Sequence, residues 1–251
     1  MSEIPQESPH LSPRPRPGGP MVMRQRWRDL LFLHWTVHPD VIAKTLPPGL
    51  TVDVWQDRAW VGIVPFFMEG VRPSYLPAVP WLSSFLELNV RTYVRDAEGR
   101  PGVWFYSLDC NRWPAVRLAR GAFHLAYRHA DMHAERGQDG TVSYQSRRTE
   151  GGGHAEAYYQ YRGAGKIRQA EAGSTAYFLL ERYRLYSWNA SRRSLHTGEV
   201  WHPPYPIQEA VVEEWSAAPA VWNGDFALEG PPVACHYSPG VDVGVFPLRA
   251  V

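Results

Sequence analysis

The chain has 251 residues, of which 44% are hydrophobic, so it can bury one substantial core in one large or two small domains. Its 26 basic and 25 acidic residues give a net charge of only +1, which provides no electrostatic footprint for nucleic acid or for an anionic membrane. No apolar run approaches the length of a transmembrane helix. The composition therefore favours a small-molecule ligand as the partner, with no nucleic acid and no membrane.

The first twenty residues differ from the rest of the chain in composition. They contain six prolines and no apolar run, and such a segment cannot bury enough surface to offset the entropy lost on ordering. They also lack the hydrophobic region of a secretory signal. We therefore expect residues 1–20 to form a disordered tail and residues 21–251 to form a single domain. Cys110 and Cys235 are too far apart for a metal knuckle or a redox pair, and we expect free buried thiols in a cytoplasmic protein.

The first half of the remaining chain predicts strands joined by short turns, because runs of branched and aromatic residues alternate with turn residues. Such runs occupy residues 30–37, 52–55, 59–67, 85–94 and 103–109. The turn at 96–99 predicts that the last two of these strands form a hairpin. A short helix is expected at 39–45, because Pro39 suits the first helical position and further prolines follow the segment.

The segment 73–80, which lies between two of these runs, contains three prolines and predicts a long irregular loop, of the kind that often forms a lid or a binding loop. The second half of the chain predicts more strands and few helices. Helices are expected at 115–123 and near 174–180. Further strands are expected after residue 130, at 182–188 and twice between 200 and 215. Many short strands and frequent turns predict a β-rich α+β fold.

The strand at 85–94 carries the main candidate site. Alternation places Glu87, Asn89, Arg91 and Tyr93 on one face, and leucine, valine and threonine side chains on the other. On an ordinary sheet the polar face would be solvated. In a small barrel that encloses a ligand cavity, the same face could point inward and supply a buried carboxylate with an arginine nearby. The residues alone leave both interpretations open.

Metal and nucleotide sites have little support. His129 and His133 have the spacing of two metal ligands on a helix, but their segment is more typical of a strand, where this spacing separates the side chains by two full repeats. The residues between them lack the glutamate of a zinc protease. No phosphate-binding glycine loop, dinucleotide fingerprint or Gly-x-Ser-x-Gly elbow is present. We expect no metal and no cofactor.

The segment 119–130 resembles the signature of acetoacetate decarboxylase-like proteins with its reactive residue replaced. That signature has glycine-arginine-glutamate, two residues, glycine, an aromatic residue, proline, two lysines, one residue and alanine. Aligned without a gap, its arginine falls on Arg120, its lysine pair on Tyr127 and Arg128, and its final alanine on Ala130. A tyrosine cannot form an imine, so the resemblance implies a fold and a pocket more directly than a reaction.

The chain has only two lysines, Lys44 and Lys166. In decarboxylases of this type, a lysine of depressed pKa forms a Schiff base with a β-keto acid. Lys44 ends the short helix expected at 39–45, and Lys166 follows a glycine-rich turn, so both are expected to be exposed to water. We therefore expect that this protein is not a Schiff-base decarboxylase.

Longer blocks make the chain similar to the YqjF-like group of the acetoacetate decarboxylase-like superfamily. The blocks are residues 32–35, 46–50, 59–66, 71–73, 87–94, 101–103, 105–109, 180–183 and 202–206. The resemblance implies a mostly antiparallel, partly closed β-barrel with a central cavity and short peripheral helices. Acetoacetate decarboxylases carry a glutamate at the place similar to Glu87, which favours the inward interpretation of the polar face.

The resemblance also suggests roles for single residues. Glu87 and Tyr127 are candidate catalytic residues that exchange a proton or donate a hydrogen bond. Candidate substrate-binding residues are Arg91, Arg120, Arg128 and Tyr93, since arginine binds carboxylates through two donors at once. Trp104 and Tyr106 are further candidates for the pocket wall.

Three hypotheses about function follow. The first is an enzyme, of lyase or isomerase type, that acts on a small keto acid or carbonyl metabolite without a Schiff-base lysine. The second is a non-catalytic binding protein that holds a small molecule in the same cavity. The third is a scaffold whose polar stripe is solvated, which burial of Glu87 would exclude. The sequence is compatible with a homo-oligomer.

Overall fold

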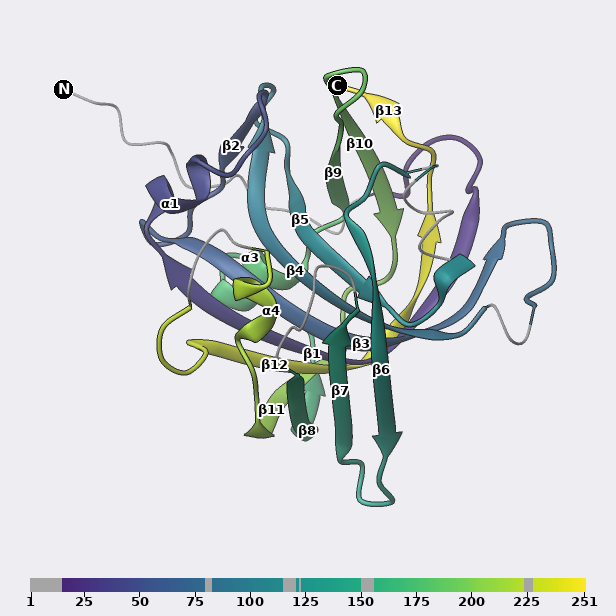
Figure 1. Cartoon of the computed structure of the whole chain (residues 1–251), viewed down its shortest axis with the longest axis vertical. Coiled ribbons are helices and arrows are strands. Elements are labelled where there is room, and N and C mark those ends of the chain that lie inside the picture. The colour runs from purple at the N-terminus through teal and green to yellow at the C-terminus, as the bar shows by residue number, and fades with distance from the viewer. Residues whose placement is uncertain (1–14, 80–82, 115–120, 122, 150–155, 224–227) are drawn as a thin grey trace.

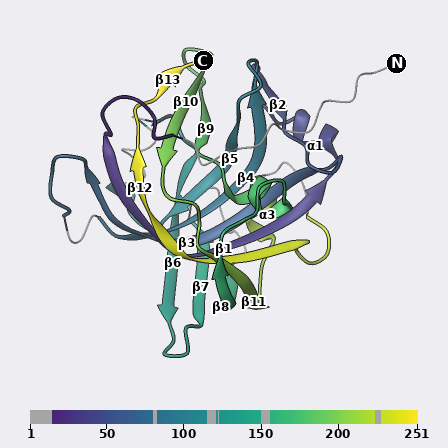
Figure 2. The same cartoon turned by 180° about the vertical axis from the view of Figure 1, so that it is seen from behind.

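The computed structural model describes residues 15–79, 83–114, 121, 123–149, 156–223 and 228–251. The described part is built mainly of strands (Figures 1 and 2). The strands are β1 (Met23–Val37), β2 (Leu50–Val52), β3 (Ala59–Pro73), β4 (Phe85–Asp96), β5 (Pro101–Cys110), β6 (Tyr127–Arg136), β7 (Val142–Arg148), β8 (Ala157–Arg168), β9 (Arg184–Asn189), β10 (Ser194–Trp201), β11 (Ile207–Glu214), β12 (Ala234–Val245) and β13 (Arg249–Ala250). Short helices include α1 (Pro39–Ala43), α3 (Thr175–Leu180) and α4 (Ala218–Val221).

The strands form one sheet that closes on itself twice. Within the described residues, neighbours in the order β5-β6-β7-β8-β11-β12-β1-β3-β4 are paired, and the pairing of β4 with β5 closes a ring of nine strands. A second ring, of seven strands, follows β10-β9-β5-β4-β3-β1-β12 and is closed by the pairing of β10 with β12. The strands β1, β3, β4, β5 and β12 belong to both rings, and we call them the shared wall.

The two rings separate where β5 and β12 change partners. One edge of β5 pairs with β4, while its other edge pairs in parallel with β9 at Val103 and Trp104 and with β6 from Leu108 to Cys110. Similarly, β12 pairs with β11 near Tyr237 and with β10 near Val245. In both views β12, drawn in yellow, runs alongside β1 (Figures 1 and 2).

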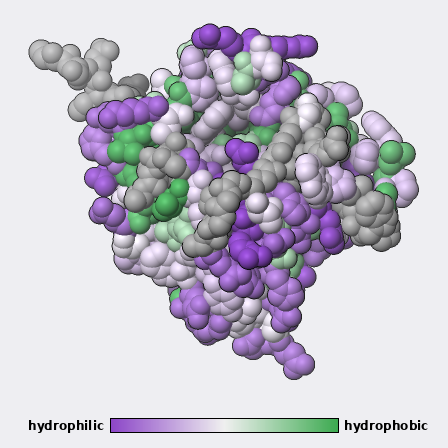
Figure 3. Space-filling model, viewed as in Figure 1, coloured by the Kyte–Doolittle hydropathy of each residue, from purple (hydrophilic) through white to green (hydrophobic). Residues whose placement is uncertain are grey.

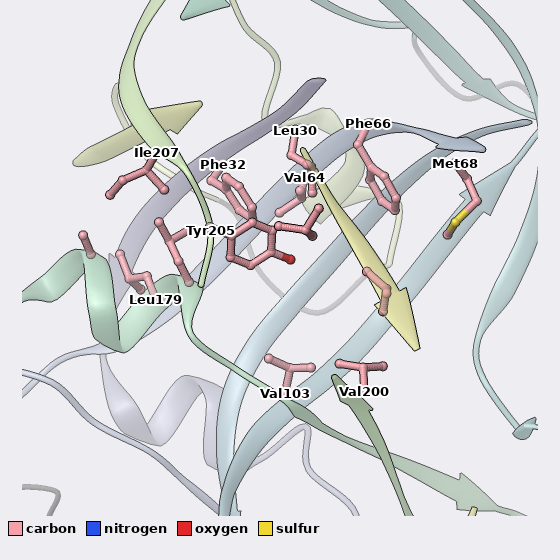
Figure 4. Close-up of a cluster of buried hydrophobic side chains, with 14 of the residues drawn as sticks. Leu30, Phe32, Val64, Phe66, Met68, Val103, Leu179, Val200, Tyr205 and Ile207 are labelled. Carbon is pink, nitrogen blue, oxygen red and sulfur yellow. The ribbon is translucent and has the colours of Figure 1, made fainter. Parts of the chain in front are cut away.

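Successive side chains of the shared wall point into two different cores, because side chains alternate along a strand. On β1, Leu30 and Phe32 belong to an apolar cluster that extends to β10 and α3, on the side of the seven-strand ring. Their neighbours Leu31 and Leu33 belong to a second cluster that extends to β7 and β8, on the side of the nine-strand ring. Figure 4 shows part of the first cluster, in which Phe32 lies beside Tyr205.

Burial on both sides excludes the solvated interpretation of the polar face on β4. Every residue from Phe85 to Val94 is buried, including Glu87 at 3% exposure. The scaffold hypothesis, in which the polar stripe faces water, is therefore wrong.

The observed elements match most of the predicted ones, including the hairpin of β4 and β5 and the helix that follows Ser174. Most of the helix expected at 115–123 lies outside the described residues. The strand expected at 52–55 is observed as β2, two residues earlier. The sequence analysis predicted no strand after residue 215, whereas β12 is one of the longest in the sheet. Pro239 and Gly240 interrupt its pattern, and such residues usually argue against a strand interior.

The outer surface is polar over the projecting hairpin of β6 and β7. This hairpin extends away from the rings in Figure 1, and hydrophilic residues cover it in Figure 3. Among the described helices, none has the length and apolar character needed to cross a membrane.

Candidate active site

The seven-strand ring holds a cavity of about 270 Å³. Its wall is mostly apolar, and Figure 4 shows several of the apolar side chains that line it, such as Phe32 and Phe66. Three polar side chains of β4 reach it, namely Glu87, Asn89 and Arg91. The proline-rich segment between β3 and β4, predicted to be a lid or a binding loop, also contributes lining residues. The cavity thus combines an apolar wall with a polar stripe along one strand.

Glu87 and Tyr127 are brought together by strand pairing around β5. Glu87 on β4 lies opposite Cys110 of β5, and Tyr127, the first residue of β6, lies opposite Leu108 on the other edge of β5. The Tyr127 hydroxyl donates a hydrogen bond of 2.7 Å to Oε2 of Glu87. Two residues that are 40 positions apart in sequence therefore form one polar pair at the cavity.

The environment of this pair shifts both pKa values. Burial raises the pKa of Glu87 to about 7, against the opposing effect of hydrogen bonds from Tyr127 and Asn89, and the nearby charge of Asp109 raises it further. Burial and the Glu87 charge hold the pKa of Tyr127 well above 10. Glu87 can therefore gain and lose a proton near neutral pH, as a general acid or base requires. Tyr127 keeps its proton and acts as a hydrogen-bond donor.

Asn89 and Arg91 carry buried polar atoms that have no partner within the part of the chain that the structure describes. Oδ1 of Asn89 is buried and has no partner among the described residues. Nη2 of Arg91 donates to the backbone oxygen of Leu179 at 3.2 Å, while its buried Nε has no described partner. No described carboxylate forms an ion pair with Arg91, which is only 8% exposed. These atoms can bind a polar ligand.

Tyr93 supports Arg91 instead of lining the cavity. Its hydroxyl donates to the backbone oxygen of Leu179 at 2.9 Å and lies 2.7 Å from Nε2 of His34. Its ring lies under the Arg91 guanidinium, 5.8 Å from ring centroid to Cζ. Burial and the Arg91 charge hold the pKa of His34 well below 6.5, so this imidazole is neutral. The structure thus gives Tyr93 a position behind the predicted substrate-binding arginine.

Arg182 is a lining residue that the sequence analysis did not assign to the site. Its guanidinium contacts Oδ2 of Asp53 at 2.7 Å and donates to the backbone oxygen of Phe178 at 2.6 Å. Asp53 also binds Arg95 at 2.8 Å. Arg182 falls in a block that resembles the YqjF-like group, but nothing in its local pattern indicates the cavity.

Other predicted residues lie elsewhere. Arg128 is exposed on β6 and does not line the cavity. Arg120 lies outside the described residues. Trp104 and Tyr106 do not line the cavity, because a bulge in β5 opposite Val90 and Arg91 shifts the alternation, and Phe105 faces the cavity instead.

The histidine pair and the two lysines do not form an alternative site among the described residues. Among the described residues, His129 and His133 belong to no cluster of three or more groups that could hold a metal ion. Lys44 and Lys166 are both exposed, as the sequence analysis expected.

Comparison with solved structures shows the same fold in acetoacetate decarboxylase-like enzymes. The acetoacetate decarboxylase of Legionella pneumophila matches with a TM-score of 0.63 and 14% identity, over 96% of this chain and 92% of that one. The enduracididine biosynthesis enzyme MppR, complexed with the condensation product of pyruvate and imidazole 4-carboxaldehyde, matches with a TM-score of 0.63 and 13% identity, over 92% and 90%. At these identities the likeness shows the fold alone, and it confirms the predicted fold class.

The family is shown by sequence. The uncharacterized protein YqjF of Bacillus subtilis is 37% identical over 233 residues, which cover 93% of this chain and 94% of that protein. Residues 24–242 match DUF2071, a family described as an uncharacterized conserved protein. The chain therefore belongs to the DUF2071 family and has the fold of acetoacetate decarboxylase.

Proposed function

We propose that this protein is an enzyme that moves a proton on a small carbonyl compound in the cavity, without a Schiff-base lysine. The observation that carries the proposal is the hydrogen bond of 2.7 Å from half-buried Tyr127 to buried Glu87 at the cavity, with the pKa of Glu87 raised to about 7. Carboxyl groups tuned in this way are typical of general acids and bases. The structural neighbour MppR was solved with a pyruvate-derived ligand, which is also a carbonyl compound.

The reaction would begin with proton abstraction. The Glu87 carboxylate takes a proton from the carbon next to the carbonyl group, and the C–H electron pair forms an enolate. The Tyr127 hydroxyl turns from Glu87 to the carbonyl oxygen and stabilises the developing negative charge. Where a C=C bond adjoins the enolate, protonated Glu87 returns the proton to the far carbon of the resulting dienolate and the double bond shifts, which completes an isomerisation. Where the carbon next to the enolate carries a leaving group, the enolate electron pair forms a C=C bond and the group departs with the proton from Glu87, which completes an elimination.

Exchange of hydrogen for deuterium tests this step without knowledge of the natural product. We expect the protein to accelerate exchange of the protons next to the carbonyl group in methyl-ketone acids dissolved in D₂O, as measured by NMR. Glu87→Gln should reduce the enzymatic rate by about 10²- to 10⁴-fold, since it removes the base. Tyr127→Phe should reduce it less and move the pH dependence to higher pH, because the Tyr127 hydrogen bond lowers the pKa of Glu87. The rate should rise through about pH 7, where Glu87 loses its proton.

Borohydride reduction in the same mixtures distinguishes this mechanism from imine chemistry. We expect no adduct on Lys44 or Lys166 by mass spectrometry, because both are exposed and lie outside the cavity lining. A stoichiometric lysine adduct, with activity abolished by its change to arginine, would refute the proposed mechanism.

A non-catalytic binding protein is the second candidate, favoured by the mostly apolar lining of the cavity. Binding sites for small molecules are usually apolar with a few polar groups that fix orientation. Saturable binding of the ligands by both the natural chain and Glu87→Gln, with no exchange above the buffer rate, would support this candidate over the enzyme.

A further inference from the structure

The cavity has an uncompensated cationic end. Arg91 lines it with no carboxylate partner among the described residues, and its buried Nε has no hydrogen-bond acceptor. Arg182 lines the same end, and its carboxylate partner Asp53 is shared with Arg95. Asp53 is thus shared by Arg182 and Arg95, whereas Arg91 has no carboxylate partner among the described residues. A buried charge without a partner is costly, so this end favours an anionic ligand group.

The cationic end and the proton-transfer pair are well separated. Glu87 and Arg91 lie four residues apart on β4, which corresponds to roughly 13 Å between their Cα atoms at about 3.3 Å per residue. Arg91 reaches the backbone oxygen of Leu179 on α3, whereas Glu87 contacts Tyr127 on β6. The Arg91 charge contributes to the pKa shifts of His34 and Tyr93, but it is not among the causes of the Glu87 shift.

The space between the two ends suits a short chain. Side chains on one face of a strand stand roughly perpendicular to the sheet, so the functional groups of Glu87 and Arg91 are separated by a distance similar to that of their Cα atoms. With contacts of about 3 Å at each end along this line, roughly 7 Å remain between the anionic group and the reacting carbon. Bonds of about 1.5 Å advance an extended carbon chain by roughly 1.25 Å each, so about five or six bonds span this distance. The cavity of about 270 Å³ has room for roughly nine water-sized groups. Asn89 lies between the ends, and the remaining wall is largely apolar.

We infer that the ligand is an elongated oxo acid, whose carboxylate binds Arg91 and whose carbonyl group lies at Glu87 and Tyr127, about five or six bonds away. The identity of the reacting end rests on the proposed function. The length of the ligand rests on the spacing of the two ends. Acids such as acetoacetate, in which the carboxylate lies two bonds from the carbonyl carbon, are too short to reach both.

A series of methyl-ketone acids tests the inference. Calorimetric titration would compare acetoacetate, 4-oxopentanoate, 5-oxohexanoate, 6-oxoheptanoate and 7-oxooctanoate, with the corresponding amides as neutral analogues. We expect the affinity to peak at the two longest acids, at least tenfold above acetoacetate, and to fall about 10- to 100-fold in their amides. Arg91→Gln should reduce the affinity for acids by a similar factor and leave the amides unaffected.

Control variants distinguish the effect of the Arg91 charge on binding from an effect of the substitution on folding. Arg91→Lys keeps the charge and should retain more affinity than Arg91→Gln, while Arg147→Gln removes an exposed arginine and should change nothing. Acetoacetate binding most tightly, or amides binding the natural chain as tightly as acids, would overturn the inference. Titrating Glu87→Gln with the same series keeps the two proposals distinguishable, because this variant tests length preference without proton transfer. Absence of exchange by the natural chain, with the length preference retained, would count against the proposed function alone.

Discussion

Because the Glu87 carboxyl is buried, the free energy of unfolding depends on pH. The pKa of this carboxyl is about 7 in the folded chain, against about 4.5 for an exposed glutamate in the unfolded chain. The folded state therefore binds more protons than the unfolded state between these values, and the free energy of unfolding falls as pH rises from about 4.5 to about 7. At about 1.36 kcal/mol per pH unit, the loss is roughly 3 kcal/mol and is complete above pH 7.

Glu87→Gln should remove this dependence, because an amide has no proton to lose. We expect the variant to be more stable than the natural chain at pH 8 and to gain little at pH 5, as measured by urea denaturation at both values. Differences between the two chains cancel the contributions of buried histidines such as His34. Glu135→Gln, at an exposed position, is a matched control. An equal stability change at both pH values would show that Glu87 titrates normally.

At the scale of elements, β1 and β12 are joined around an irregularity. Asp29 has a positive φ of 50°, and Gly240 opposite Arg28 has a φ of +133°. A Cβ atom on Gly240 would lie 2.1 Å from the backbone oxygen of Trp27, a distance that real atoms do not reach. The close approach of these two strands of the shared wall therefore requires glycine.

Gly240→Ala should consequently destabilise the fold by more than about 2 kcal/mol, because both the dihedral angle and the space exclude a side chain. Gly99→Ala is the matched control. Gly99 also has a positive φ, of +75°, but a Cβ there meets nothing within 4 Å, so only the backbone cost of about 1–2 kcal/mol applies. Chemical denaturation of both variants measures the difference, and equal losses would show that the close contact is relieved cheaply.

Local patterns predicted the elements better than they predicted the site. The alternation at residues 85–94 was sufficient to place Glu87 and Arg91 on one face, because the face to which each side chain points follows from its position along the strand. The bulge at Tyr106 and the course of β12 depend on partner strands that are distant in sequence. Arg182 reaches the cavity from the segment after α3, a placement that no local period encodes.

At the scale of the whole molecule, the tail expected at residues 1–20 falls within the described residues only from residue 15 onward. Among residues 15–20, the backbone oxygen of Gly18 accepts a long bond of 3.4 Å from Arg249. We expect a chain that begins at Met21 to melt within about 3 °C of the full chain, since one exposed hydrogen bond is worth about 1 kcal/mol or less. A chain that begins at Arg24 should melt lower, because it also loses the bond from Val22 to Val245 and the lining residue Met23. Equal melting temperatures of the full chain and the chain that begins at Arg24 would show that Val22 and Met23 do not stabilise the fold.

The place of β12 in the sheet has a consequence for the newly synthesised chain. This strand completes the nine-strand ring between β1 and β11 and the seven-strand ring between β1 and β10. Ribosomes deliver it after every strand that it joins. Until Ala234–Val245 emerges, β1, β10 and β11 each keep an edge of unpaired backbone groups, which is the kind of edge that pairs with other chains. Neither core can be sealed until β12 has emerged, so both rings close only after all the strands that β12 joins have been synthesised.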